Sequence, residues 1–116
     1  MTTPTTALGI ISGTSMDGID VACVVTDGER VIKRGPGATF AYPDDVRRDL
    51  IALVQDPQRA EHGPIGDIEA RVTNAHVAAV TQYLERYRTQ IDAVDVLGFH
   101  GQTIIHRPER RFTRQL

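Results

Sequence analysis

Hydrophobic and polar positions alternate in the first third of this 116-residue chain and then change to helical spacing. Ala7 to Ile11 and Ile19 to Thr26 are apolar runs rich in β-branched residues, which is typical of strands. A polar, glycine-containing loop separates them. Asp27-Gly28 is a hairpin signal, so Val31 to Phe40 is predicted to be a third, antiparallel strand. A proline inside that run, Pro36, indicates an edge strand or a bulge.

Two amphipathic helices are predicted to follow. The first extends from Pro43 to about Asp56, and its apolar residues are Val46, Leu50 and Leu53. The second begins at Gly63-Pro64 and continues to about Arg88. Its predicted buried face consists of Ile65, Ile68, Val72, Ala75, Ala79, Tyr83 and Leu84.

The last part of the chain returns to strand-like patterns. Ala93 to Phe99 is predicted to be a buried strand, and a short apolar pair, Ile104-Ile105, follows a polar cluster. Phe112 to Leu116 alternates apolar and polar residues without a following turn or polar tail, so we expect the chain to be part of a longer protein. The element order predicts an α/β fold with a five-stranded mixed sheet covered by the long helix.

Composition narrows the possible partners. Thirteen Lys and Arg against fifteen Asp and Glu give a net charge of −2, which argues against nucleic acid or an anionic membrane as a partner. The single cysteine, Cys23, cannot form an internal disulfide. Every apolar run is shorter than the roughly 18 to 20 residues that cross a bilayer. With no signal-peptide pattern at the N-terminus, we predict a cytoplasmic protein.

The loop between the first two predicted strands has the composition of a phosphate-binding site. It combines two glycines, two hydroxyls and two carboxylates, which suit close backbone approach, hydrogen bonds to phosphoryl oxygens and Mg²⁺ binding. The candidate residues are Gly13, Thr14, Ser15, Met16, Asp17, Gly18, Ile19 and Asp20. The loop is neither a Walker A motif nor a G-x-G-x-x-G motif. A tight turn at Asp17-Gly18 with no ligand is the structural alternative.

A second candidate segment, His100 to Thr103, directly follows the predicted strand that ends at Phe99. Open α/β sheets place their ligand crevices at such strand ends. His100, Gly101, Gln102 and Thr103 offer the donors and acceptors that would match sugar hydroxyls. The alternative is that His100 is a structural residue whose hydrogen bonds are satisfied within the protein.

The two segments together resemble the anhydro-N-acetylmuramic acid kinases. The resemblance rests on Gly9 to Asp20, GIISGTSMDGID, and on Gly98 to Pro108, GFHGQTIIHRP. It implies that the first motif is the ATP phosphate loop and that the second contributes to the sugar site. The implied fold is the ribonuclease-H-like mixed sheet of the actin-like and sugar-kinase ATPase superfamily, with residues 1–116 forming an incomplete N-terminal domain. That superfamily often has an Asp two residues before the loop glycine, where this sequence has Ile11.

The resemblance also implies a reaction. Water opens the 1,6-anhydro bridge of the cell-wall sugar, and the released O6 takes the γ-phosphoryl group of ATP, with Mg²⁺, to give N-acetylmuramic acid 6-phosphate for peptidoglycan recycling. The general base is expected beyond Leu116, so no catalytic residue is assigned here, and we expect the 116-residue chain alone to lack kinase activity. The partner is the small-molecule sugar, and a homodimer of the full-length protein is compatible with the resemblance.

Two alternatives remain open from the sequence. One is a module that binds nucleotide or another anion without catalysis, and the other is a non-functional truncated product. ATP binding without turnover would favour the first. An unpaired sheet edge that makes the chain poorly soluble would favour the second.

Overall fold

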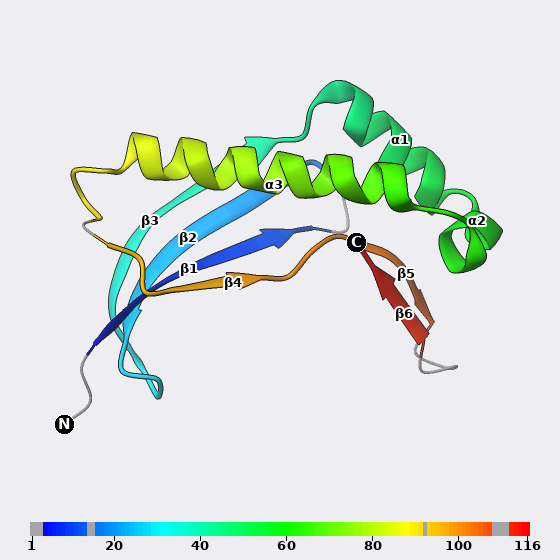
Figure 1. The fold of residues 1–116 in the computed structure, drawn as a ribbon. Coiled ribbons are helices and arrows are strands. Elements are labelled where there is room, and N and C mark those ends of the chain that lie inside the picture. The colour runs from blue at the N-terminus through cyan, green and yellow to red at the C-terminus, as the bar shows by residue number, and fades with distance from the viewer. Residues whose placement is uncertain (1–3, 14–15, 92, 108–111) are drawn as a thin grey trace.

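A computed structural model of the chain describes residues 4–13, 16–91, 93–107 and 112–116. The main sheet in these ranges has four strands, namely β1 (Thr5–Ser12), β2 (Gly18–Thr26), β3 (Val31–Ala41) and β4 (Val96–Phe99). Their order is β3-β2-β1-β4, with antiparallel pairing of β1 with β2 and of β2 with β3, and parallel pairing of β1 with β4 (Figure 1). The three predicted N-terminal strands are therefore confirmed.

The predicted hairpin between β2 and β3 forms around Gly28. This glycine has a φ of 98°, a left-handed conformation that side chains disfavour. The Asp27 carboxylate accepts hydrogen bonds from the backbone N–H groups of Glu29 (2.9 Å) and Arg30 (3.0 Å). These bonds lower the pKa of Asp27. The turn is thus closed by the residue types that identified it in the sequence.

An irregularity interrupts the pairing of β2 and β3 at the predicted proline. Ala22 pairs with Gly37 and Val24 pairs with Arg34, so the register shifts opposite Gly35 and Pro36. This confirms the bulge. β3 is also an edge strand of the main sheet, the other position that accommodates a proline.

Three helices follow β3, namely α1 (Asp44–Val54), α2 (Pro57–His62) and α3 (Gly66–Arg86). α3 crosses one face of the sheet, whereas α2 contacts α1 and β5 (Figure 1). No helix in the described ranges is long and apolar enough to cross a bilayer. The buried apolar side chains between helices and sheet include Leu8, Ile10, Ile19, Val21, Phe40, Val46, Leu50, Leu53, Ile68, Val72, Ala79 and Tyr83. Both predicted helices are confirmed, whereas α2 was not predicted.

The predicted buried face of α3 needs two corrections. Leu84 is 38% exposed, because the residue that faces the sheet in that turn is its neighbour Tyr83. His76 is buried at 3% exposure, although its polar ring gave no reason to place it in the core. Its Nδ1 lies 2.7 Å from the carbonyl oxygen of Val72, one turn earlier. This bond satisfies one side of the ring inside the helix.

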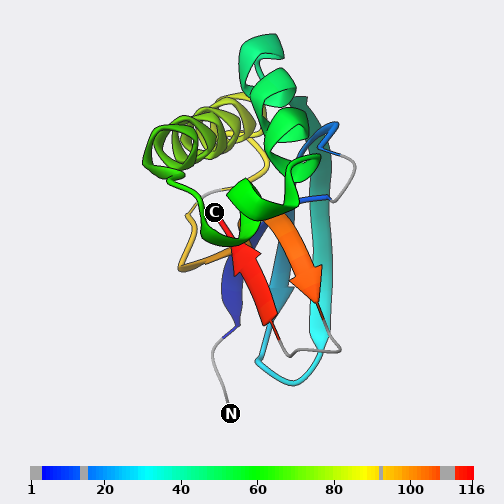
Figure 2. The same ribbon diagram turned by 90° about the vertical axis from the view of Figure 1, so that its right-hand side faces the viewer.

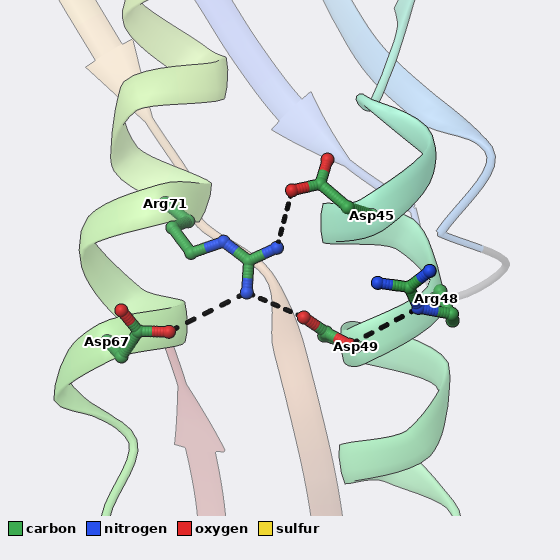
Figure 3. Close-up of polar contacts among 5 residues, drawn as sticks. All are labelled: Asp45, Arg48, Asp49, Asp67 and Arg71. Carbon is green, nitrogen blue, oxygen red and sulfur yellow. Dashed lines mark hydrogen bonds and ion pairs between the residues drawn. The ribbon is translucent and has the colours of Figure 1, made fainter.

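An arginine on α3 joins the two main helices (Figure 3). The guanidinium of Arg71 lies 2.9 Å from Asp45 and 2.6 Å from Asp49, both on α1, and 3.6 Å from Asp67 on its own helix. The hydrogen bonds from Arg71 hold the pKa values of Asp45 and Asp49 below their ordinary value. Because the cluster is partly exposed, solvent and salt screen it.

The C-terminal strands contradict the prediction of a single five-stranded sheet. β5 (Thr103–Arg107) and β6 (Phe112–Gln115) form a separate antiparallel pair, which stands in front of the main sheet in Figure 2. The reason is the turn at Gly101, whose φ of 80° redirects the chain after β4. A Cβ at this glycine would collide with the carbonyl oxygen of Leu116. The chain therefore leaves the main sheet before β5 begins.

The strand predicted to be buried is also exposed. In β4, Val96, Leu97 and Phe99 are 53%, 51% and 51% exposed. Within the described residues β4 has a strand neighbour on one side, β1, and lies at the edge of the sheet. Apolar composition alone could not distinguish a central strand from an edge strand.

Candidate functional site

Parallel pairing of β1 and β4 brings the two candidate segments to the same end of the sheet. Ile10 pairs with Phe99, and the backbone N–H of His100 donates to the carbonyl oxygen of Ile10 over 3.0 Å. β1 then leads to Ser12 and Gly13, and β4 leads to His100 (Figure 1). Two motifs that are far apart in the sequence are therefore neighbours in space.

The candidate phosphate loop begins with a turn. The carbonyl oxygen of Gly13 accepts a hydrogen bond of 3.1 Å from the backbone N–H of Met16, which has a left-handed φ of 58°. Thr14 and Ser15, the candidate hydroxyl donors, lie outside the described residues. At the end of the loop, a Cβ on Gly18 would lie 2.9 Å from the carbonyl oxygen of Phe40. This glycine is thus needed because the loop approaches β3 closely.

The remaining loop residues divide between the core and the surface. Met16 and Ile19 are buried in the core, so their side chains are not exposed to solvent. Asp17 is exposed, and its carboxylate lies 3.3 Å from the guanidinium of Arg47. Asp20 accepts a hydrogen bond of 2.6 Å from the Thr39 hydroxyl. Among the described residues of the loop, the carboxylates of Asp17 and Asp20 are therefore the side chains exposed to solvent.

The carboxylate of Asp20 belongs to a groove that also reaches the second segment. The groove has a volume of about 470 Å³ and is lined by Gly9, Ile10, Ile11, Asp20, Ala22, Gly98, Phe99 and His100. Most of these positions are small or apolar, which allows close approach of a ligand to the sheet. Asp20 and His100 supply its ionisable side chains.

A buried polar cluster lies beneath the loop, formed by Ser12, Tyr42 and Gln102. These residues are 5%, 3% and 0% exposed. The Ser12 and Tyr42 hydroxyls are 2.6 Å apart, Ser12 donates to the Gln102 Oε1, and the Tyr42 hydroxyl lies 3.3 Å from the same oxygen. Burial raises the pKa of Tyr42, which keeps the phenol protonated as a donor.

The amide nitrogen of Gln102 points to two backbone carbonyls. Nε2 donates to the carbonyl oxygen of Gly13 over 3.1 Å and to that of Thr103 over 3.0 Å. The side chain therefore connects the second candidate segment directly to the first. Its sequence position indicated a sugar contact, whereas its observed partners are protein groups.

The exposed groups of the second segment line another depression. It measures about 390 Å³ and is lined by His100, Thr103, His106, Thr113 and Gln115. The Gln115 amide donates to the Thr103 hydroxyl over 3.1 Å, and the His106 Nδ1 lies 2.6 Å from the Thr113 hydroxyl. Imidazole, hydroxyl and amide groups surround this space, a combination that matches a ligand rich in hydroxyls.

Sequence reasoning missed Tyr42 and the three residues that β5 and β6 add, His106, Thr113 and Gln115. Tyr42 directly follows β3, and alternation beyond Phe40 could have assigned it to the buried face. His106 lies within the second motif but was not singled out, and Thr113 and Gln115 carry no local signal. They reach His100 because β5 and β6 pair with each other, which is a tertiary property.

Carboxylates of the loop are the candidate ligands for Mg²⁺ in this region. Among the described residues, no group of three or more His, Cys, Asp or Glu side chains could hold a metal ion. Mg²⁺ at nucleotide sites usually takes one or two carboxylates and completes its coordination with phosphate oxygens and water. Asp17 and Asp20 fit that limited role, since both are exposed and both border the loop.

Comparison with known proteins decides the family. The model of the anhydro-N-acetylmuramic acid kinase family matches residues 5–116. The chain belongs to this family.

Curated members of the anhydro-N-acetylmuramic acid kinase family agree with this assignment. The chain is 44% identical to the anhydro-N-acetylmuramic acid kinase of Agrobacterium fabrum, 46% to that of Rhizobium johnstonii and 43% to that of Brucella canis. These matches cover 96%, 96% and 95% of the chain. In each case they cover 31% of the relative, so the chain spans about a third of the length of the curated relatives it matches.

Proposed function

We propose that residues 1–116 form the N-terminal part of an actin-like domain in an ATP-dependent kinase that acts on 1,6-anhydro-N-acetylmuramic acid. The family match over residues 5–116 supports this, together with the meeting of the two motifs at one end of the sheet. The proposed superfamily is that of ribonuclease-H-like ATPases and sugar kinases. Three antiparallel strands followed by helices and a parallel fourth strand are compatible with it.

The two ligands are proposed to occupy different sides of the site. The loop from Gly13 to Asp20 receives the phosphates of ATP, and its exposed carboxylates, Asp17 and Asp20, hold Mg²⁺. When bound, Mg²⁺ would neutralise charge on the phosphates. The sugar lies toward His100 and Thr103, whose depression is bordered by hydroxyl, amide and imidazole groups. We further propose a cytoplasmic location and a homodimer for the full-length protein, as the family resemblance implies.

The proposed chemistry has two steps. Water adds to the anomeric carbon of the anhydro sugar, the bond from that carbon to O6 breaks, and O6 keeps the electron pair and takes a proton. O6 then releases this proton to solvent and bonds to the γ-phosphorus of ATP, while the bond from that phosphorus to the β,γ-bridging oxygen breaks and ADP leaves with the electron pair. The residues of this chain contribute binding and orientation, which supply much of the catalysis in phosphoryl transfer. No residue of the chain is proposed as the general base.

A chimeric kinase tests this proposal. Residues 1–116 would replace the matching N-terminal 31% of the Agrobacterium fabrum kinase, and they keep their numbers. We expect ATP-dependent conversion of the anhydro sugar to a product that is heavier by one water and one phosphoryl group, detected by mass spectrometry. The 116-residue chain alone is the negative control. A folded chimera that forms no phosphorylated sugar would contradict the proposed function.

A further inference from the structure

We propose that Gln102 is a positioning residue for the phosphate loop, acting through the carbonyl group of Gly13 and without contact to the sugar. This inference deepens the proposed function and rests on it. Gln102 was expected to be a sugar contact, but its side chain is fully buried.

Protein groups use the whole hydrogen-bonding capacity of the Gln102 side chain. A primary amide has two N–H donors and an oxygen with two lone pairs. The donors bond to the carbonyl oxygens of Gly13 and Thr103, and the oxygen accepts from Ser12 and lies within reach of Tyr42. A sugar hydroxyl would have to displace one of these buried bonds, which leaves a polar group without a partner.

The orientation of the amide is determined by its neighbours. Backbone carbonyls can only accept, so the side of Gln102 that faces Gly13 and Thr103 must be the NH₂ group. The opposite side faces two hydroxyls, and these can donate to the oxygen. The phenol of Tyr42 is protonated at neutral pH, and burial raises its pKa further above the ordinary value. The amide therefore has one favourable orientation, with its nitrogen toward the loop.

The Gly13 carbonyl is the point at which this orientation affects the loop. Its oxygen accepts two hydrogen bonds, one from Gln102 and one from the backbone N–H of Met16 that closes the turn. These two bonds fix the direction of the Gly13 carbonyl at the start of the loop, so the backbone there is preorganised before a phosphate binds.

The kinetic test uses Gln102→Met in the chimeric kinase, a substitution that retains bulk and removes the amide. We expect kcat/KM for ATP to fall on the order of tenfold, because the Gly13 carbonyl loses a buried donor, while the KM for the sugar stays unchanged. Gln102→Asn is the second variant, since it keeps an amide but its side chain is shorter by one methylene and no longer reaches Gly13. We again expect a lower kcat/KM for ATP and an unchanged KM for the sugar. The matched control is Tyr83→Phe, which removes a partly buried hydrogen bond to Pro36, outside the loop, and should leave both KM values unchanged.

Hydrogen exchange supplies a readout that does not depend on kinase activity. We expect the Met16 amide to exchange several-fold faster in Gln102→Met than in the unsubstituted chimera, and Tyr83→Phe should not reproduce this local effect. A rise in the sugar KM with unchanged ATP kinetics would overturn the inference and restore Gln102 as a sugar contact. Unchanged Met16 exchange would also overturn it. A chimera without kinase activity refutes the proposed function, whereas Met16 exchange still decides the role of Gln102.

Discussion

The phenol of Tyr83 on α3 donates a hydrogen bond of 2.6 Å to the carbonyl oxygen of Pro36 on β3. Pro36 lies at the bulge where β2 and β3 change register. The bond therefore attaches the long helix to the irregular part of the edge strand. Burial raises the pKa of Tyr83 to about 12, with smaller contributions from Cys23 and Tyr87, so the phenol remains a donor throughout the neutral range.

Tyr83→Phe should lower the free energy of unfolding by about 1 kcal/mol. The aromatic ring and its packing remain, so the loss reflects the hydrogen bond to Pro36. Urea unfolding followed by circular dichroism measures the change. If the variant were as stable as the unsubstituted chain, the hydrogen bond from Tyr83 to Pro36 would contribute no more to stability than the hydrogen bond that the phenol makes to water in the unfolded chain.

Arg71→Met should lower the melting temperature at neutral pH and low ionic strength, and the effect should shrink in 1 M NaCl. The substitution leaves three carboxylates grouped without their shared cation (Figure 3). Because the pKa values of Asp45 and Asp49 are lowered in the folded state, the stabilisation is present above about pH 4 and is lost as the pH falls through those lowered values.

Arg48→Met is the matched control for the Arg71 variant. Arg48 lies 3.6 Å from Asp49 and its side chain is 75% exposed, so its removal should have little effect on melting. Thermal melts at pH 7 and pH 3, each at low and high salt, separate the two cases. Equal destabilisation by both variants would show that net charge matters and that the arrangement around Arg71 does not.

His76 should make the chain less stable as the pH falls below about 6.5. Burial lowers the pKa of His76 from 6.5, while the hydrogen bond to the Val72 carbonyl acts in the opposite direction. Within the described residues its Nε2 has no hydrogen-bond partner, and the ring packs against Phe99 at 4.8 Å between centroids. Protonation would thus leave a charge in apolar surroundings. The unfolded chain binds the proton more readily, so stability is full above pH 6.5 and is lost as the pH falls through the lowered pKa.

Comparison with His76→Phe isolates this contribution from that of the carboxylates. Unfolding free energies measured in urea at pH 7.5 and pH 5.5 should decrease more for the unsubstituted chain than for the variant. The same pH dependence in both proteins would assign the effect to other groups.

Gly13→Val in the chimeric kinase should lower kcat/KM for ATP on the order of 10², the scale associated with loss of a preorganised charge-stabilising donor. A branched side chain would occupy the space that the phosphates need beside the backbone. Gly66→Ala is the glycine control, because a Cβ there meets no atom within 4 Å and the position begins α3, away from the loop. Unchanged ATP kinetics in Gly13→Val would show that the phosphates bind elsewhere.

Local patterns in the sequence were sufficient for β1, β2, β3, α1 and α3. Their signals are alternation, helical spacing and turn residues, all of which depend on neighbours a few positions away. The hairpin at Gly28 and the bulge at Pro36 follow from the restricted backbone preferences of glycine and proline. The two motifs also identified the family, because their residues are specific without reference to the fold.

Tertiary structure alone decided which of these elements meet. An apolar strand such as β4 has the same local sequence pattern whether it lies in the centre of a sheet or at its edge. The positive φ of Gly101, which directs the chain away from the main sheet, could not be read from its neighbours in the sequence. The pairing of β1 with β4 brings Gln102 beneath Gly13, 89 residues earlier in the chain. The sequence determined that Gln102 is an amide near a strand end. Only packing decided that this amide is buried and bonded to the loop, because burial and hydrogen-bond partners depend on contacts between residues far apart in the sequence.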